Sequence, residues 1–264
     1  MKFKKIILYK EPAVSEINII QLRDFLEEKF SLSVQIAENV FSQFNEEQVR
    51  SVSSIRIKDI KNSFTRYDYN ESEFEFEKKV SNDSSLMEST IKVENADEIS
   101  QVFMYDGFEL QKILRYLNKD EQTLHIIMTN RLTCTFDEND NRYHARAVIC
   151  ANPAIISTTG IIEAPAKPRE YYFEAMALKA QGLGIESAKE KYKDKFLDYN
   201  DKRLTRIVEG YLLQVIFYNI TGESFCEDIQ CKLNNAHWQK DLLFSQIEIN
   251  NLCKKHSEIL KNLN

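Results

Sequence analysis

The sequence contains few of the residues that interrupt regular structure. Its 264 residues include only six glycines and four prolines, too few for a collagen-like or low-complexity chain. Because 43% of the residues are hydrophobic, the chain is too apolar to be disordered throughout. The length predicts one large or two small domains, and a chain of this size buries roughly three quarters of its unfolded surface without needing disulfide bonds.

Positive charge and long apolar runs are also scarce. The 35 basic residues are outnumbered by 41 acidic ones, which gives a formal charge of −6 and argues against a dedicated nucleic-acid binder. The basic start, residues 1–10, holds only four consecutive apolar residues, whereas a signal peptide needs about 7–15. No run approaches the roughly 18 residues of a membrane span. We therefore expect a cytoplasmic protein with no nucleic-acid or membrane partner.

The cysteines are odd in number. They are Cys134, Cys150, Cys226, Cys231 and Cys253. In a reducing compartment, an odd set indicates buried thiols and metal ligands rather than a disulfide framework. Cys134 and Cys150 fall in predicted strands, so we expect them to be buried thiols.

The first third of the chain predicts an α/β unit. Residues 6–9 and 32–36 have the pattern of strands, and helical apolar spacing lies between them, with Ser15 as the predicted N-cap. Residues 62–98 are polar and acidic with few apolar positions. We interpret this segment as an irregular or mobile insertion within one domain, and favour a solvated loop over an acidic docking surface.

The remaining chain alternates strands and helices and becomes helix-rich towards its C-terminus. Strands are predicted at 124–128, 143–150 and 155–162, and helices at 107–117, 169–180 and 204–220. The pattern predicts an α/β (α+β) fold in which a mixed sheet packs on helices, as a single domain over residues 1–264.

Four residues near the C-terminus have the spacing of a zinc site. Cys226, Cys231, Cys253 and His256 form a C-x4-C-x21-C-x2-H pattern. Zinc favours thiolate and imidazole ligands in a tetrahedral arrangement, supplied here as two close pairs. Cys253 and His256 would project from one side of a helix. The alternative interpretation makes the cysteines buried thiols and His256 a solvated residue.

Several segments together resemble a known family. They are Tyr143–Cys150, Ser157–Gly160, Glu163–Tyr172, Phe225–Cys231 and Asn235–Gln239. The chain resembles an archaeal family of unknown function whose members are labelled as candidate metallopeptidases, over most of residues 105–256. That family is distantly similar to archaemetzincins, zinc peptidases with the motif H-E-x-x-H-x-x-G-x-x-H, a directly following C-x4-C and a later C-x-x-C. The resemblance implies a metzincin-like domain whose cysteines bind a structural zinc.

The same resemblance places other residues where the catalytic ligands should be. The three histidine positions and the general-base position are taken by Val215, Asn219, Phe225 and Ile216. Valine and phenylalanine cannot bind zinc, and isoleucine cannot accept a proton. The standard catalytic motif is therefore degenerate.

A rearranged catalytic site would have to use other residues. The chain has four histidines, and the candidates are His144, Glu163 and His237, holding a second, catalytic metal. The alternative interpretation, which we favour, makes both histidines hydrogen-bonded core residues. If His256 binds the structural zinc, a three-histidine catalytic zinc would need His125 from a buried strand as well.

Three functions follow from these interpretations. The first is a zinc metallopeptidase-like protein with a structural zinc, which would hydrolyse peptides if active. The second is a catalytically inactive, metzincin-like module that binds a peptide or protein. The third, a small zinc module that recruits nucleic acid, is disfavoured by the acidic charge balance.

Overall fold

The computed structural model describes residues 3–11, 16–63, 70–83 and 103–263. Its strands are β1 (Lys5–Lys10), β2 (Ser33–Ala37), β3 (Met104–Asp106), β4 (Thr123–Thr129), β5 (Leu132–Asp137), β6 (Arg142–Arg146), β7 (Val148–Ile149) and β8 (Ala154–Ser157). Its α-helices are α1 (Ile19–Phe30), α2 (Glu46–Ser54), α3 (Glu71–Asn82), α5 (Gly107–Leu114), α6 (Thr158–Glu163), α7 (Arg169–Ala180), α8 (Glu186–Tyr192), α9 (Leu204–Thr221), α10 (Gln239–Leu243) and α11 (Lys254–Lys261). Shorter helical turns are η1 (Phe41–Gln43), η2 (Arg115–Leu117), η3 (Lys193–Lys195) and the π-helix η4 (Phe244–Ile249).

The strands form two sheets. The larger has the order β2-β1-β4-β8-β7, in which the first four strands are parallel and the edge strand β7 is antiparallel to β8. The smaller has the order β3-β5-β6. Only Ala147 separates β6 from β7. The segment expected as one strand over 143–150 is therefore two short strands that belong to different sheets.

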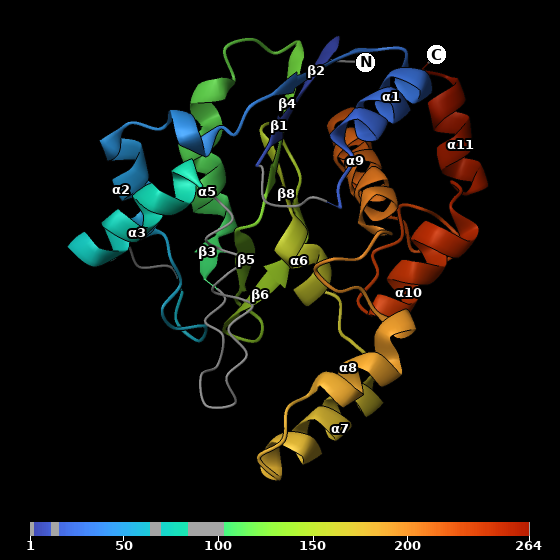
Figure 1. Ribbon diagram of the computed structural model, residues 1–264. Helices are drawn as coiled ribbons and strands as arrows, with labels where there is room; N and C mark the ends of the chain where they lie inside the picture. The colour runs from blue at the N-terminus through green and yellow to red at the C-terminus, as the bar shows by residue number, and fades with distance from the viewer. Residues whose placement is uncertain (1–2, 12–15, 64–69, 84–102, 264) are drawn as a thin grey trace.

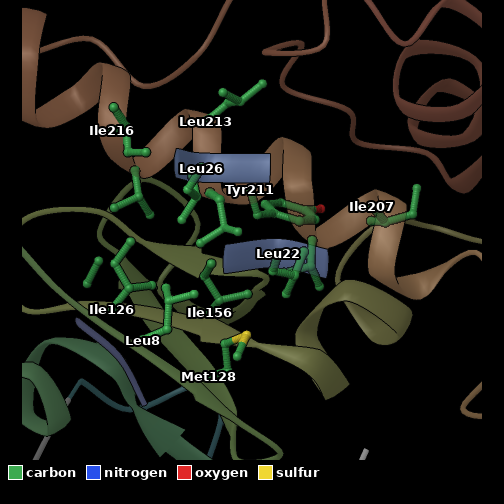
Figure 2. Close-up of a cluster of buried hydrophobic side chains, with 14 of the residues drawn as sticks. Leu8, Leu22, Leu26, Ile126, Met128, Ile156, Ile207, Tyr211, Leu213 and Ile216 are labelled. Carbon is green, nitrogen blue, oxygen red and sulfur yellow. The ribbon is translucent and has the colours of Figure 1, made fainter. Parts of the chain in front are cut away.

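Alternate side chains of the large sheet enter two separate cores. Leu8 and Ile126 pack towards α1 and α9, whereas Tyr9 and Ile127 pack towards α2 and α5. Figure 1 shows these helices on opposite sides of the sheet. Figure 2 shows the first core, where side chains of the sheet meet those of the two helices. Each fully buried aliphatic side chain stabilises the fold by roughly 1.5–3 kcal/mol.

Helix α9 is buried on almost every side. Thirteen of its residues are buried, including all those from Ile207 to Phe217, so it is a core helix rather than one with a single apolar stripe. The π-helix η4 packs closely against it, because a Cβ atom at Gly210 would lie 1.7 Å from Gln246 Oε1. Gly222 ends α9 with a left-handed φ of 84°, a conformation that favours glycine.

Two sequence-based expectations in the first half need correction. The segment 62–98 is not irregular throughout, because α3 occupies Glu71–Asn82 and buries Phe74, Glu77 and Val80; residues 64–69 and 84–98 of that segment lie outside the described residues. The predicted N-cap Ser15 also lies outside them, and α1 is capped by Asn18, whose side chain accepts a hydrogen bond from the Gln21 amide.

One further correction concerns the predicted strand over 155–162. β8 ends at Ser157, whose hydroxyl oxygen accepts a hydrogen bond from the Gly160 amide and caps α6. The main expectation is confirmed: the fold is α/β, with a mixed sheet packed on helices and a helix-rich C-terminal part. Among the described helices, none is both long enough and apolar enough to cross a membrane.

Candidate metal centre and groove

The four predicted zinc ligands come from two structural elements. Cys226 and Cys231 lie in the loop that follows Gly222, and backbone hydrogen bonds close this loop from Cys226 N–H to Leu233 C=O (2.8 Å) and from Asn235 N–H to Cys226 C=O (3.3 Å). Cys253 is the N-cap residue of α11, and its helix carries His256. The fold brings the two pairs of ligands together.

The ligand atoms of this cluster, which we call the Cys/His cluster, all lie within 4.8 Å of one another. Cys226 Sγ is 4.0 Å from Cys253 Sγ, and His256 Nδ1 is 3.1 Å from Cys253 Sγ and 3.6 Å from Cys231 Sγ. Sulfur ligands of a tetrahedral zinc with Zn–S distances near 2.3 Å lie about 3.8 Å apart. The donor atoms therefore fit one zinc ion without a large rearrangement.

Burial and hydrogen bonding also suit the cluster to a metal. Burial, with a smaller contribution from the neighbouring Lys255 charge, lowers the pKa of His256 and favours the neutral imidazole that metals bind. Burial raises the pKa of Cys231 to about 12, so a metal would have to displace that thiol proton. The Cys253 amide donates to Cys231 Sγ over 3.4 Å, and Phe217 packs edge-on against the His256 ring. Three thiolates and one imidazole make a closed, four-coordinate set of the structural type.

The catalytic positions implied by the family resemblance have a different environment. Val215 and Ile216 are fully buried in the core that α9 shares with the sheet. The Asn219 amide donates to the carbonyl oxygens of Ala151 (3.3 Å) and Val215 (2.9 Å). Phe225 is 43% exposed. These residues offer no set of ligands for a catalytic zinc.

A groove of about 460 Å³ is lined in part by residues that are close in sequence to Cys226 and Cys231 of the Cys/His cluster. Its walls are formed by residues 145–150 of β6 and β7, by the α9 side chains Tyr211 and Gln214, and by the loop segments 224–225 and 234–237. Gln214 donates through Nε2 to the Asn234 carbonyl (3.3 Å). Its buried Oε1 atom has no hydrogen-bond partner among the described residues, which is unusual for a buried acceptor.

The three candidates for a rearranged catalytic site are not brought together. His144 lies on β6, and its Nε2 is 2.7 Å from Oδ2 of Asp140 in the β5–β6 turn, where Asp137 is also close. Glu163 accepts a hydrogen bond from the Tyr199 hydroxyl (3.0 Å). Of the three, only His237 lines the groove. His237 is exposed and His144 is half-buried, so the expectation that both histidines are core residues is wrong. The three candidates do not form a group of potential metal ligands among the described residues.

Comparison with known proteins assigns the family. The sequence matches the probable metallopeptidase family (DUF6775) over residues 2–263. The chain belongs to this family. The expected resemblance to a family labelled as candidate metallopeptidases is thereby confirmed. Among solved structures, a crystal structure of a zinc-dependent peptidase from Methanocorpusculum labreanum is similar at 11% identity, covering 97% of this chain and 99% of that chain, with a TM-score of 0.40. No curated protein matches the sequence.

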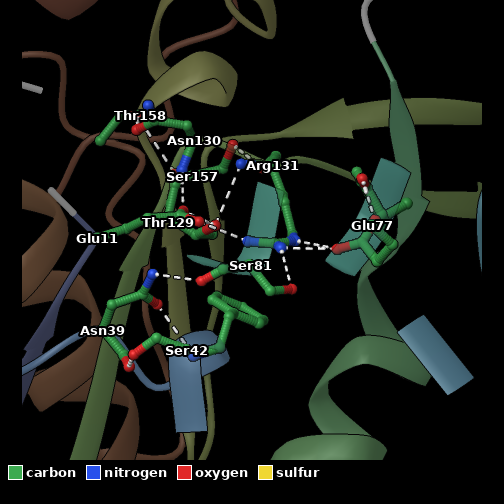
Figure 3. Close-up of polar contacts among 12 residues, drawn as sticks. Glu11, Asn39, Ser42, Glu77, Ser81, Thr129, Asn130, Arg131, Ser157 and Thr158 are labelled. Atoms are coloured by element: carbon green, nitrogen blue, oxygen red, sulfur yellow. Dashed lines mark hydrogen bonds and ion pairs between the residues drawn. The ribbon is translucent and has the colours of Figure 1, made fainter. Parts of the chain in front are cut away.

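This family member also contains a buried ionic network, which we call the Arg131 network, that the sequence did not reveal. Arg131 follows β4, is fully buried, and binds Glu11 Oε1 through Nη1 (2.5 Å) and Glu77 Oε1 through Nη2 (2.6 Å) (Figure 3). Its guanidinium carbon lies 3.8 Å from the centre of the Phe41 ring. The Tyr105 hydroxyl donates to Glu77 Oε2 (2.8 Å).

The Arg131 network lies where the carboxyl ends of β1 and β4 meet, a common place for ligand sites in parallel sheets. Here, however, Glu11 also accepts hydrogen bonds from the Thr129 hydroxyl and the Asn130 amide. Both carboxylates and the guanidinium are thus satisfied within the protein. We therefore assign the network a structural role: it holds α3 against the sheet.

Proposed function

We propose that this member of the probable metallopeptidase family holds one structural zinc ion and binds an extended peptide in the groove without hydrolysing it. One contrast carries the proposal. The side chains of the Cys/His cluster converge within 4.8 Å, whereas Val215 and Ile216, at two catalytic positions of the resembled motif, are fully buried in the hydrophobic core. A zinc peptidase needs a metal position open to water and substrate.

The structural zinc would connect two parts of the C-terminal region. Cys226 and Cys231 lie on the loop after α9, and Cys253 and His256 lie at the start of α11. A zinc ion held by all four would fix the last helix against the end of α9. Structural zinc contributes directly to folding free energy because its site is absent in the unfolded chain.

The groove has features that suit an extended peptide. β7 is an edge strand of the large sheet, and an extended peptide can add to such an edge through main-chain hydrogen bonds. Gln214 lines the same groove. Its Oε1 atom is a buried acceptor without a partner among the described residues, and a peptide N–H would satisfy it. Arg146, whose Nε donates to the Thr135 hydroxyl (2.8 Å), adds positive charge to the same wall.

A second candidate function is peptide hydrolysis at a rearranged centre. It is favoured by the family assignment and by His237, which lines the groove. This function requires a second metal ion, because the four residues of the Cys/His cluster form a closed set. The zinc content per chain therefore separates the two candidates.

The test combines metal counting with peptide binding. Elemental analysis of the purified full chain should give one zinc per chain. A labelled library of extended peptides should bind without cleavage, as followed by mass spectrometry. Gln214→Leu should weaken peptide binding about tenfold, because it removes a buried hydrogen-bond acceptor, whereas Gln181→Leu at the exposed end of α7 should not change it.

Two outcomes would contradict the proposal. Two zinc ions per chain together with chelator-sensitive cleavage would establish the hydrolase. Failure of the library to bind at all, in a protein that holds one zinc, would show that the groove is not a peptide site.

A further inference from the structure

A second, larger pocket is lined in part by the α9 residues Thr205, Arg206 and Glu209. It has a volume of about 880 Å³ and is bordered by α1, the start of α9, the segment 247–252 and α11. Figure 1 shows α1, α9 and α11 grouped at the same end of the molecule. Its lining contains one acidic residue, Glu209, and six cationic ones: Lys29, Lys202, Arg203, Arg206, Lys232 and Lys261. The pocket is therefore rich in positive charge, although the formal charge of the whole chain is −6. We call it the basic pocket.

The acidic group in the lining of the basic pocket is already neutralised. Glu209 Oε2 accepts a hydrogen bond from Lys232 Nζ (3.0 Å), and Glu209 Oε1 accepts one from Gln21 Nε2 (3.1 Å). Lys232 is buried, and its ammonium also donates to Asn250 Oδ1 (2.6 Å). Glu209 therefore leaves little negative charge to attract the other cations of the pocket.

Several of the remaining cations have no counter-ion. Lys202 lies two residues before the start of α9, Arg206 lies in the first turn of α9, and Lys261 is the last residue of α11. In the described parts of the chain, no ion pair involves any of these three side chains, whereas Arg203 pairs with Asp201. Like charges gathered in a concave surface repel one another. A bound polyanion would relieve that repulsion.

The start of α9 adds a further preference for anions. The N-cap residue Arg203 makes no side-chain capping bond to the helix, and residues Thr205 and Arg206 of the first turn line the pocket. The N-terminal end of an 18-residue helix carries a partial positive charge that favours phosphate groups. Arginine and lysine side chains supply the hydrogen-bond donors that phosphate oxygens accept.

We propose that the basic pocket binds a small compound that carries a triphosphate group, either a nucleoside triphosphate or inorganic triphosphate. The pocket is concave and confined to one group of helices, whereas a nucleic acid is bound along an extended basic surface. The site is separate from the peptide groove, because the two share no lining residue. The triphosphate compound would therefore be a second ligand of the protein, independent of the proposed peptide function.

Calorimetry of the full-length, zinc-loaded protein tests the proposal at about 0.15 M salt, where weak surface attraction is largely screened. Inorganic triphosphate and ATP are titrated separately, and tighter binding of ATP identifies the nucleoside form. We expect saturable binding at one site. The double variant Lys202→Glu/Arg206→Glu should bind at least about tenfold more weakly, because charge-assisted hydrogen bonds are lost.

A matched control separates the pocket from general electrostatics. Arg115→Glu/Lys119→Glu changes the same charges at the same spacing on an exposed turn after α5, and it should leave the affinity within about twofold of wild type, since distant exposed charges are screened. Absence of saturable binding would overturn the proposal. So would an equal loss of affinity in both double variants, or tighter binding of duplex DNA than of either triphosphate compound.

A measurement on the wild-type protein tests the pocket without any substitution that could disturb the fold. Saturating triphosphate should protect Lys202 and Lys261 from acetylation, measured by mass spectrometry, and should leave Lys119 as reactive as before. Equal reactivity of all three lysines with and without triphosphate would overturn the assignment of the ligand to this pocket.

Discussion

The middle of α9 and the Cys/His cluster are close in sequence but opposite in character. Val215 and Ile216 are completely buried among apolar side chains. Only ten residues beyond Ile216, Cys226 begins a cluster in which three sulfur atoms and one imidazole nitrogen converge. The comparison teaches that potential metal ligands converge between the loop after α9 and the start of α11, whereas Val215 and Ile216 in the middle of α9 offer none.

Removal of zinc should change the stability of the protein more than any of the substitutions described below. If the Cys/His cluster holds zinc, Cys231→Ser or treatment with a strong chelator should lower the free energy of unfolding by at least about 3 kcal/mol, because metal binding adds to folding free energy. Urea denaturation with and without chelator measures the change. Cys150→Ser, at a half-buried thiol outside the cluster, is the control and should retain zinc. The same urea midpoint with and without chelator would contradict a structural role for zinc.

The Arg131 network extends the comparison to a polar cluster that needs no metal. Arg131→Met should destabilise the protein by about 3–5 kcal/mol, because it leaves the buried carboxylate of Glu11 without its cation and leaves Glu77 with Arg56 alone. Arg23→Met removes a solvent-exposed ion pair with Asp24 and should cost less than about 1 kcal/mol. Chemical denaturation of both variants checks the difference. Similar losses in the two variants would show that the network is not important for stability.

A histidine placed in α9 tests whether the helix can regain a metal ligand. Val215→His should destabilise the protein by about 2–4 kcal/mol, because a polar ring replaces a fully buried apolar side chain. The zinc content should not increase. Val215→Ala serves as the control, since it removes apolar contacts without adding a polar group. An additional zinc ion bound by the histidine variant would mean that this position faces a metal site after all.

The smallest expected effect concerns a buried histidine outside the Cys/His cluster. His125 lies on β4 and accepts or donates a hydrogen bond with the Tyr9 hydroxyl (3.0 Å), and burial lowers its pKa from 6.5. The unfolded chain therefore binds a proton at a higher pH than the folded one, so this contribution to stability is present above about pH 6.5 and is lost as the pH falls through the folded pKa.

Unfolding experiments at several pH values between 7 and 5 check this sign. We expect wild type to lose more stability on acidification than His125→Gln does. A His125→Gln variant with the same pH dependence as wild type would show that His125 does not contribute.

The sequence predicts well those features that depend on local pattern. Helix α7 has the expected bounds, Arg169–Ala180, because its turn-forming neighbours Pro168 and Gly182 mark both ends. The Cys/His cluster could also be predicted, since zinc ligands in close pairs leave a characteristic spacing. Family membership could be inferred from the motifs that flank these residues.

Features that depend on distant partners could not be predicted. Glu77 resembles a solvated residue in an acidic segment, and its burial is explained by distant partners, chiefly Arg131, more than fifty positions later, and Tyr105. Likewise, no local pattern shows that His144 on β6 contacts Asp140 while His237 lines the groove. The unpartnered oxygen of Gln214 depends on the packing of α9 against the C-terminal loop.

The zinc content of the purified full chain tests the central claim most directly. Elemental analysis should give one zinc per chain in wild type and in His237→Ala, and almost none in Cys231→Ser. Two zinc ions per chain in wild type, falling to one in His237→Ala, would contradict the account and place a second metal in the groove.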